Sequence, residues 1–368
     1  MLDQDNLLLS IGRRVTLEKS CNNSIMPNPY LNQAPIHFWK TAVAGLAPRS
    51  VVPIRARRFP IDDGALIATA GSCFAQEVGK HLATMPGVTL LRAETPEPDQ
   101  PLFSALYGNV YTVRQLVQLF DRAFGCLTPI DVAWRRDDGR YVDPFRPYVF
   151  RDGFLTIEHV ENARRVHLDA VRHVFMDSSV FIFTLGLTES WRSAVDGAVF
   201  PVAPGVVSEE IRTADYEFHN FTYAEVLADL DDFISRLRSV NPAIRVILTV
   251  SPVPLIATYT AEHVLVATSH SKAILRAVCG EVDTKCDFVH YFPSYEIISG
   301  HFNKGAYYAD NLRSVTREGV EHVMAIFRQT YFGASEDGPA EISIPTPKPV
   351  VSEPICDEEE IVRSIGFD

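Results

Sequence analysis

A serine stands where a short apolar run gives way to a helical pattern. Residues 66–70 predict a buried strand closed by Gly71, and residues 73–82 then carry apolar side chains at a spacing of four. Ser72 therefore falls at the start of a helix, where backbone N–H groups and the helix dipole favour negative charge. This setting suits a nucleophile beside part of an oxyanion hole. A serine in this position is also a common helix cap, so position alone leaves both interpretations open.

The residues around this serine resemble a known signature. The pentapeptide Gly71-Ser72-Cys73-Phe74-Ala75 is the one that names the GSCFA family, whose members look like SGNH/GDSL hydrolases. Four further blocks follow in the family's order, over roughly residues 28–332: Ser104-Ala105-Leu106-Tyr107-Gly108-Asn109-Val110-Tyr111, Thr184-Leu185-Gly186-Leu187-Thr188-Glu189-Ser190-Trp191, Val250-Ser251-Pro252-Val253-Pro254 and Tyr291-Phe292-Pro293-Ser294-Tyr295-Glu296. The resemblance implies an esterase or O-acyltransferase that works through an acyl-Ser72 intermediate. It also implies a bacterial setting and an acyl ester substrate, such as an acylated saccharide of surface-polysaccharide synthesis.

The resemblance also implies roles for other residues. Gly108 is similar to a glycine that gives a backbone donor in SGNH enzymes, and Asn109 stands beside it. The third SGNH block usually reads Gly-x-Asn, with the asparagine amide as oxyanion donor, whereas here Gly186 is followed at that spacing by Thr188. The Thr188 hydroxyl or the Asn109 amide could replace the missing donor. Glu189 follows the same strand and is a further candidate carboxylate for substrate contact.

The general base is where the chain departs from the family. SGNH enzymes end with Asp-x-x-His, whereas this chain has Asp310-Asn311-Leu312-Arg313-Ser314, and neither register supplies a histidine. We expect His322, in the last helix, to act as the base with Asp310 as its carboxylate, and His301 as the alternative base. The competing hypothesis is a catalytically degenerate saccharide-binding or assembly protein that keeps the fold. Cys73 is expected to pack away from Ser72 as a small apolar side chain.

The elements that position these residues alternate along the chain. Apolar runs predict strands, and amphipathic stretches between them predict helices. This order is typical of a three-layer α/β/α sandwich with a mostly parallel sheet. Strands are predicted over residues 66–70, 88–91, 180–185, 245–250 and 288–292, and helices over 73–82, 113–124, 161–175, 223–240, 261–278 and 316–332.

Two insertions interrupt the alternation, at residues 130–158 and 191–220. Each contains an Asp-Gly turn signal, which predicts a β-hairpin. The first insertion is rich in aromatic and charged residues. It could form a wall on which a sugar ring stacks, or a hairpin that packs on the edge of the domain.

Composition bounds the domains and partners. We expect an irregular arm over residues 1–62 that packs on the domain, an α/β domain over 63–332, and a disordered, acidic, proline-rich tail over 333–368. The net charge is −12, which disfavours nucleic acid as a partner. No apolar run suits a membrane span or signal peptide, and no motif suits a metal or cofactor, so a reduced, cytoplasmic protein without cofactor is expected. Nothing in the sequence indicates the oligomeric state.

Overall fold

The computed structural model describes residues 28–54, 57–97, 100, 102–333 and 357–366. The chain divides into two units, residues 1–46 and residues 47–368. The described part of the first unit holds a 3-10 turn at Pro35–His37 and a single π-helical turn at Lys40–Ala44. Residues 1–27 of the predicted arm lie outside the described residues.

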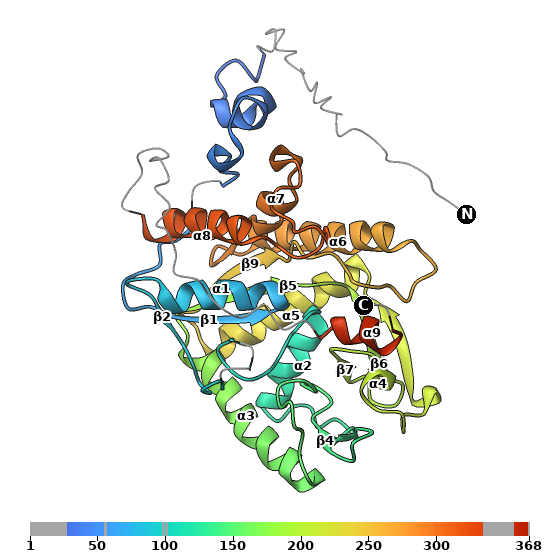
Figure 1. Cartoon of the computed structure of the whole chain (residues 1–368). Coiled ribbons are helices and arrows are strands. Elements are labelled where there is room, and N and C mark those ends of the chain that lie inside the picture. The colour runs from blue at the N-terminus through green and yellow to red at the C-terminus, as the bar shows by residue number, and fades with distance from the viewer. Residues whose placement is uncertain (1–27, 55–56, 98–99, 101, 334–356, 367–368) are drawn as a thin grey trace, which may run out of the picture. The chain divides into compact units, whose positions relative to one another are not determined.

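The second unit is built on a five-stranded sheet with the order β10-β9-β5-β1-β2 (Figure 1). Every neighbouring pair in it is parallel, which confirms the predicted sheet. The central strand β5 is buried along its whole length, as expected for a strand covered on both faces. The strands are β1 (Leu66–Gly71), β2 (Thr89–Leu90), β5 (Val180–Leu185), β9 (Arg245–Val250) and β10 (Val289–Tyr291).

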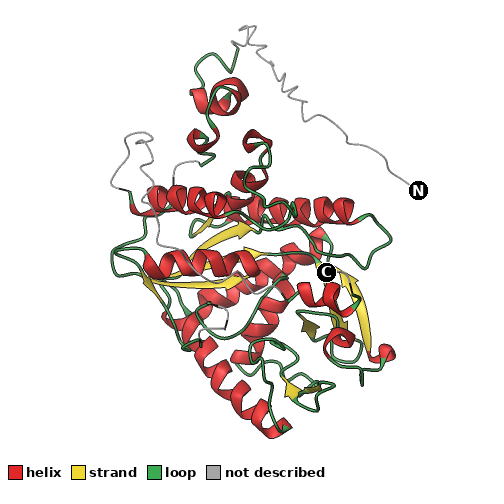
Figure 2. Cartoon of the chain, viewed as in Figure 1, coloured by secondary structure: helices red, strands yellow, loops and turns green. Residues whose placement is uncertain are grey.

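Helices cover both faces of this sheet (Figure 2). Because side chains alternate along a strand, Phe181 and Phe183 of β5 enter one apolar core with α2, α3, α5 and α6, whereas Val180 and Ile182 enter another with α1, α7 and α8. The three-layer α/β/α class is therefore the observed one. The helices are α1 (Cys73–Thr84), α2 (Val113–Ala123), α3 (Ile157–Asp177), α5 (Tyr223–Val240), α6 (Val264–Lys285), α7 (Ser294–Ser299) and α8 (Arg317–Phe332).

The last part of the predicted arm packs on the sheet domain. The backbone N–H of Ile61 donates to the carbonyl of Tyr331 at 3.0 Å. Phe59 and Ile61 are buried in the apolar core beneath α1 and α8. This stretch therefore belongs to the α/β domain.

The first insertion forms a hairpin that packs inward. Strands β3 (Trp134–Arg135) and β4 (Tyr141–Val142) pair antiparallel around the predicted turn. Trp134 and Phe145 are buried against Phe200 of the second insertion. These two aromatic side chains are therefore not available as an exposed sugar-stacking wall, and the packed hairpin is the arrangement observed.

The second insertion forms a three-stranded antiparallel sheet. Its strands are β6 (Glu189–Ser193), β7 (Val199–Phe200) and β8 (Tyr216–Asn220), in the order β7-β6-β8. The short helix α4 (Pro204–Val207) lies between β7 and β8.

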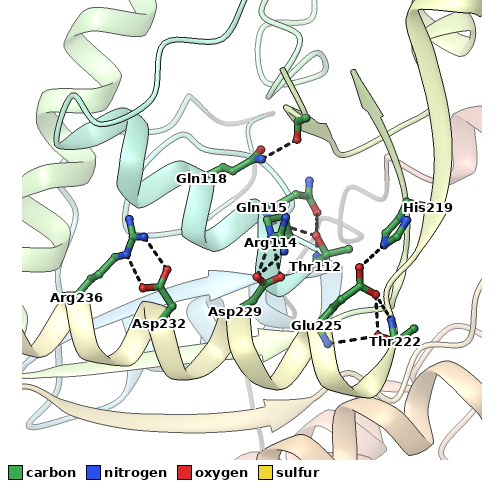
Figure 3. A network of polar contacts seen from close by, with 11 residues as sticks. Thr112, Arg114, Gln115, Gln118, His219, Thr222, Glu225, Asp229, Asp232 and Arg236 are labelled. Carbon is green, nitrogen blue, oxygen red and sulfur yellow. Dashed lines mark hydrogen bonds and ion pairs between the residues drawn. The ribbon is translucent and has the colours of Figure 1, made fainter. Parts of the chain in front are cut away.

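Polar side chains join α2 to α5 (Figure 3). Arg114 binds Asp229 with its Nε 2.9 Å from each carboxylate oxygen. At the start of α5, Glu225 accepts hydrogen bonds from Thr222 and contacts His219 of β8 at 2.8 Å. These contacts fix α2, which follows Asn109 in the chain, against α5 and the second insertion.

The prediction of a disordered tail is wrong for residues 357–366. This segment contains a helix, α9 (Glu359–Ser364), which packs against α4 (Figure 1). Asp357 and Glu358 are buried, and Ile361 packs with the apolar cluster of the two insertions. Composition predicted disorder because four consecutive acidic residues, 357–360, are expected to stay hydrated. In the structure, cationic and amide groups of the domain bind two of these carboxylates, as described below. Residues 334–356 of the predicted tail lie outside the described residues.

Candidate functional site

Three strand ends meet at one edge of the sheet. Gly71 is paired with Thr184, and Leu185 is paired with Val250. The residues that directly follow these strands are Ser72, Gly186 and Ser251, and they line one cavity. This is the edge at which parallel α/β sheets place their ligands.

The turn that carries Ser72 depends on Gly71. Gly71 has a φ of 141°, and a Cβ added to it would lie 2.4 Å from the carbonyl oxygen of Thr184. This close approach lets the Ser72 N–H donate to the same carbonyl at 3.2 Å, which seats the serine at the end of β1.

Ser72 occupies the N-cap position of α1, but its side chain makes no capping hydrogen bond. Ser72 is 2% exposed, and its Oγ has no hydrogen-bond partner within the described residues. A buried hydroxyl without a partner is costly, and a catalytic role is one of the reasons for which such a group is retained. The capping alternative for Ser72 is therefore not the one that the structure adopts.

The cavity beside Ser72 is narrow. Its volume of about 10 Å³ is at the lower limit for one water molecule. Gly186 forms one wall, and a Cβ there would lie 3.1 Å from Ser72 Cβ and 3.0 Å from the Tyr111 ring. The cavity is lined by Ser72, Cys73, Tyr111, Gly186, Leu187, Ser251, Val253, Pro254, Leu255, Lys272 and Glu358.

Lys272 of α6 brings a cation into the cavity. Its side chain reaches inward from the helix, the residue is 2% exposed, and its Nζ donates to the carbonyl of Gly186 at 2.5 Å. Burial lowers the pKa of Lys272 to about 8, and the Arg313 charge lowers it too, while Glu358 and Cys73 raise it. Sequence reasoning missed Lys272, because a lysine among the polar residues of an amphipathic helix looks like a solvent-facing one.

Cys73 lies closer to the site than expected. It lines the cavity, and its thiol interacts electrostatically with Lys272. The helical phase of α1 was expected to turn Cys73 away from Ser72. The first turn of α1 is surrounded by the ends of neighbouring strands, so a side chain there can face the site from more than one side of the helix. Helical phase alone therefore did not predict that Cys73 lines the cavity.

Arg313, in the stretch between His301 and α8, makes an ion pair with Glu358. Its Nη2 lies 3.0 Å from Glu358 Oε2, with the two side chains 14% and 11% exposed. Its Nε donates to the carbonyl of Pro254 at 3.2 Å. The guanidinium thus holds the 357–366 segment against the cavity wall.

Asn109 holds the neighbouring carboxylate of that segment. Both its side-chain amide and its backbone N–H donate to Asp357, which lowers the pKa of that carboxyl, but burial prevails and raises it to about 7. Gln76 donates to Asn109 Oδ1 at 3.0 Å and so fixes the amide with its N–H groups available as donors. The Val110 N–H donates to the Gly71 carbonyl at 2.8 Å, which places Gly108 and Asn109 near the end of β1, but neither residue lines the cavity beside Ser72.

Thr188 and Glu189 have other partners. The Thr188 hydroxyl donates to Asn220 Oδ1 at 2.7 Å, and its backbone N–H donates to Ser271. Glu189 accepts from the Thr258 hydroxyl at 2.6 Å. Neither residue lines the cavity.

The histidines and Asp310 are not brought to Ser72. His322 is buried with its Nδ1 2.8 Å from the Tyr307 hydroxyl, and burial lowers its pKa to about 4. His301 and Asp310 precede α8 in the chain, and both are exposed. His322, His301 and Asp310 are all absent from the cavity lining.

Fold and site together define a three-layer α/β protein with a buried serine at the carboxyl edge of a parallel sheet. The model of the GSCFA family matches residues 66–327, so the chain belongs to the GSCFA family. A search of curated proteins finds no match. Within the described residues, no helix is long and apolar enough to cross a membrane, and no group of three or more His, Cys, Asp or Glu side chains could hold a metal ion.

Proposed function

We propose that this protein is a serine hydrolase or O-acyltransferase related to the SGNH enzymes, with Ser72 as nucleophile. The observation that carries the proposal is the Ser72 hydroxyl itself, buried at the carboxyl edge of the sheet without a hydrogen-bond partner in the described chain. An acyl ester, with an acylated saccharide as the first class to test, is the proposed substrate.

The reaction has two steps. Ser72 Oγ forms a bond to the acyl carbon, the ester C–O bond breaks, and the serine proton leaves with the alcohol product. Water or an acceptor hydroxyl then attacks the acyl-Ser72 intermediate and releases Ser72. The Asn109 donors, which hold a carboxylate in this structure, are suited to an oxyanion once that carboxylate has left.

A second function is a saccharide-binding or assembly protein without catalysis. It is favoured by the cavity lining, which includes no histidine, and by Arg313, which pairs with Glu358 and so offers no base in the stretch 310–314 where a histidine would be expected from the SGNH resemblance.

Covalent labelling separates the two functions. A small fluorophosphonate should add one mass adduct, which maps to Ser72 and is lost in Ser72→Ala. Ser251→Ala is the matched control, because Ser251 lines the same cavity and its hydroxyl accepts from Val253. Absence of an adduct in protein that melts cooperatively would favour the binding protein.

A further inference from the structure

We propose that Lys272 accepts the proton of Ser72 when the serine attacks the acyl carbon. The inference rests on the proposed function and assigns its missing base. Lys272 and Ser72 line one cavity, and Gly186 lies next to both: its carbonyl accepts from Lys272 Nζ at 2.5 Å, and a Cβ added to it would lie 3.1 Å from Ser72 Cβ. Serine–lysine pairs without histidine are an established form of nucleophilic catalysis.

A lysine can act as a base only when it is neutral. Burial of Lys272 lowers its pKa to about 8, so a substantial fraction is neutral in mildly basic solution. The charged groups that face it are Arg313, which lowers the pKa further, and Glu358 and Cys73, which raise it.

Two other candidate proton acceptors are less suitable than Lys272. Glu358 is paired with Arg313 at 3.0 Å, and a carboxylate in that pair is a weak base. His322 is held by Tyr307 outside the cavity. Lys272 has four rotatable side-chain bonds, which allow Nζ to move between the Gly186 carbonyl and the Ser72 hydroxyl.

The proton balance is simple. The neutral amine takes the Ser72 proton as the Oγ–acyl bond forms. The resulting ammonium gives that proton to the departing alkoxide as the ester C–O bond breaks. Lys272 is neutral again, and the same exchange with water or an acceptor hydroxyl completes deacylation.

The test measures the rate of Ser72 labelling against pH in the full chain. The wild-type rate should rise with pH, because Lys272 becomes a base as it loses its proton, and burial lowers its pKa from the ordinary value. In Lys272→Met the labelling rate should fall by about 10²–10⁴-fold and should no longer depend on pH. Lys272→Arg should be equally slow, because it keeps the charge but stays protonated. Lys285→Met is the control, since Lys285 lies on the same helix and pairs with Glu281 away from the site.

The outcomes are distinguishable. Labelling of Ser72 at the wild-type rate in Lys272→Met, or rescue by Lys272→Arg, would overturn the role of Lys272 and leave Ser72 as nucleophile. Absence of labelling in wild type and variants alike would overturn the proposed function together with its base. Melting curves of each variant show whether slow labelling reflects unfolding.

A different observation supports a second inference: the 357–366 segment closes the Ser72 cavity, and substrate enters only when this segment leaves. Glu358 is itself part of the cavity wall, and the space that remains holds no more than one water molecule. A space of this size does not admit an acyl ester, and Glu358 is the residue of the 357–366 segment that bounds it.

Two carboxylates of the segment are bound by cationic and amide groups of the domain, as an acidic ligand would be. Arg313 pairs with Glu358, and Asn109 donates twice to Asp357. Asp357 is faced by Glu358 and Glu360, whose charges raise its pKa, and by Tyr148. Burial raises the pKa of Asp357 from 3.8 to about 7 in the docked state, so docking is strongest at low pH, weakens as the pH rises between these two values and changes little above about 7.

Charge reversal in the full chain tests the closure. Glu358→Lys places a cation against Arg313 and Lys272, and the segment should leave. Glu217→Lys is the control for charge reversal elsewhere, because Glu217 pairs with Arg192 in the second insertion and does not line the cavity. Two measurements report on opening without Ser72 chemistry: hydrogen exchange of the α9 amides and modification of Cys73, which lines the cavity, by a small thiol reagent.

We expect both rates to rise about 10–100-fold in Glu358→Lys, which corresponds to an open population of about 1–10% in the parent. Glu358→Gln should raise both rates by an intermediate amount. It replaces Glu358→Lys in the test if the lysine variant unfolds at a much lower temperature than the parent. Unchanged exchange of α9 and unchanged modification of Cys73 in Glu358→Lys would overturn the closure, whatever the result at Ser72.

Discussion

The pair between Arg313 and Glu358 allows a quantitative prediction. At the observed separation of 3.0 Å, two unit charges attract by about 5 kcal/mol at an effective dielectric constant near 20. Desolvation of both groups offsets part of this attraction. We therefore expect a coupling free energy of about 1–3 kcal/mol between Arg313→Ala and Glu358→Ala in a double-mutant cycle.

The two single variants should differ. In Glu358→Ala the segment can leave and let water reach Arg313, so the loss in unfolding free energy is limited to the docking free energy of the segment. Arg313→Ala also removes the hydrogen bond to Pro254 and should cost about 1 kcal/mol more.

The assay is urea unfolding of the four proteins at low and at 1 M salt. Coupling across a nearly buried pair should persist at 1 M salt, where the Debye length is about 3 Å. The control cycle uses Arg135 and Glu210, whose side chains are 48% and 62% exposed, and should give less than about 1 kcal/mol. Equal coupling in both cycles, or coupling that vanishes in salt, would refute the argument that Glu358 is docked in solution.

Further predictions concern the seat of Ser72 and the inserted hairpin. Gly71→Ala should cost several kcal/mol in unfolding free energy, measured by urea titration, because the new Cβ would meet the Thr184 carbonyl; a loss under about 1 kcal/mol would contradict the turn geometry. Cys73→Ser should keep Ser72 labelling within about threefold and lower unfolding free energy by about 1 kcal/mol, since the thiol packs at the cavity wall; abolished labelling would make Cys73 part of the chemistry. Asp143→Asn leaves two arginines without their shared carboxylate and should cost about 3–5 kcal/mol at pH 7 by the same titration. The arginines hold the pKa of Asp143 far below its usual range, so this stabilisation is present above about pH 4 and is lost as the pH falls below it; an Asn variant as stable as the parent at pH 7 would rule the network out as a support of the hairpin.

Much of the fold is local in origin and was predictable. The strands and helices around Ser72 follow from apolar periodicity, and the predicted and observed bounds of β5 and α5 are the same. The serine seat was also predictable, because a strand, a glycine and a helix start are neighbours in the chain.

Contacts between distant residues were not predictable in this way. Lys272 reaches Gly186 across 86 positions in the chain, and Arg313 reaches Glu358 across 45. Only the parallel order of the strands brings α6 to the end of β5, and only docking turns an acidic stretch into part of the cavity wall. The histidines illustrate the same limit, since His322 has a suitable residue type but faces Tyr307.

The sequence by itself determined the alternation of strands and helices along the chain, the layered class that this alternation implies, and the position of one serine at a strand end, because these follow from patterns among residues close together in the chain. The tertiary structure decided which charged groups share that serine's cavity, whether the aromatic hairpin is buried, and that an acidic segment is folded. All three features depend on burial, because the free energy of a buried charge is set by the groups around it. Those groups come from distant parts of the chain and become neighbours only when the chain folds.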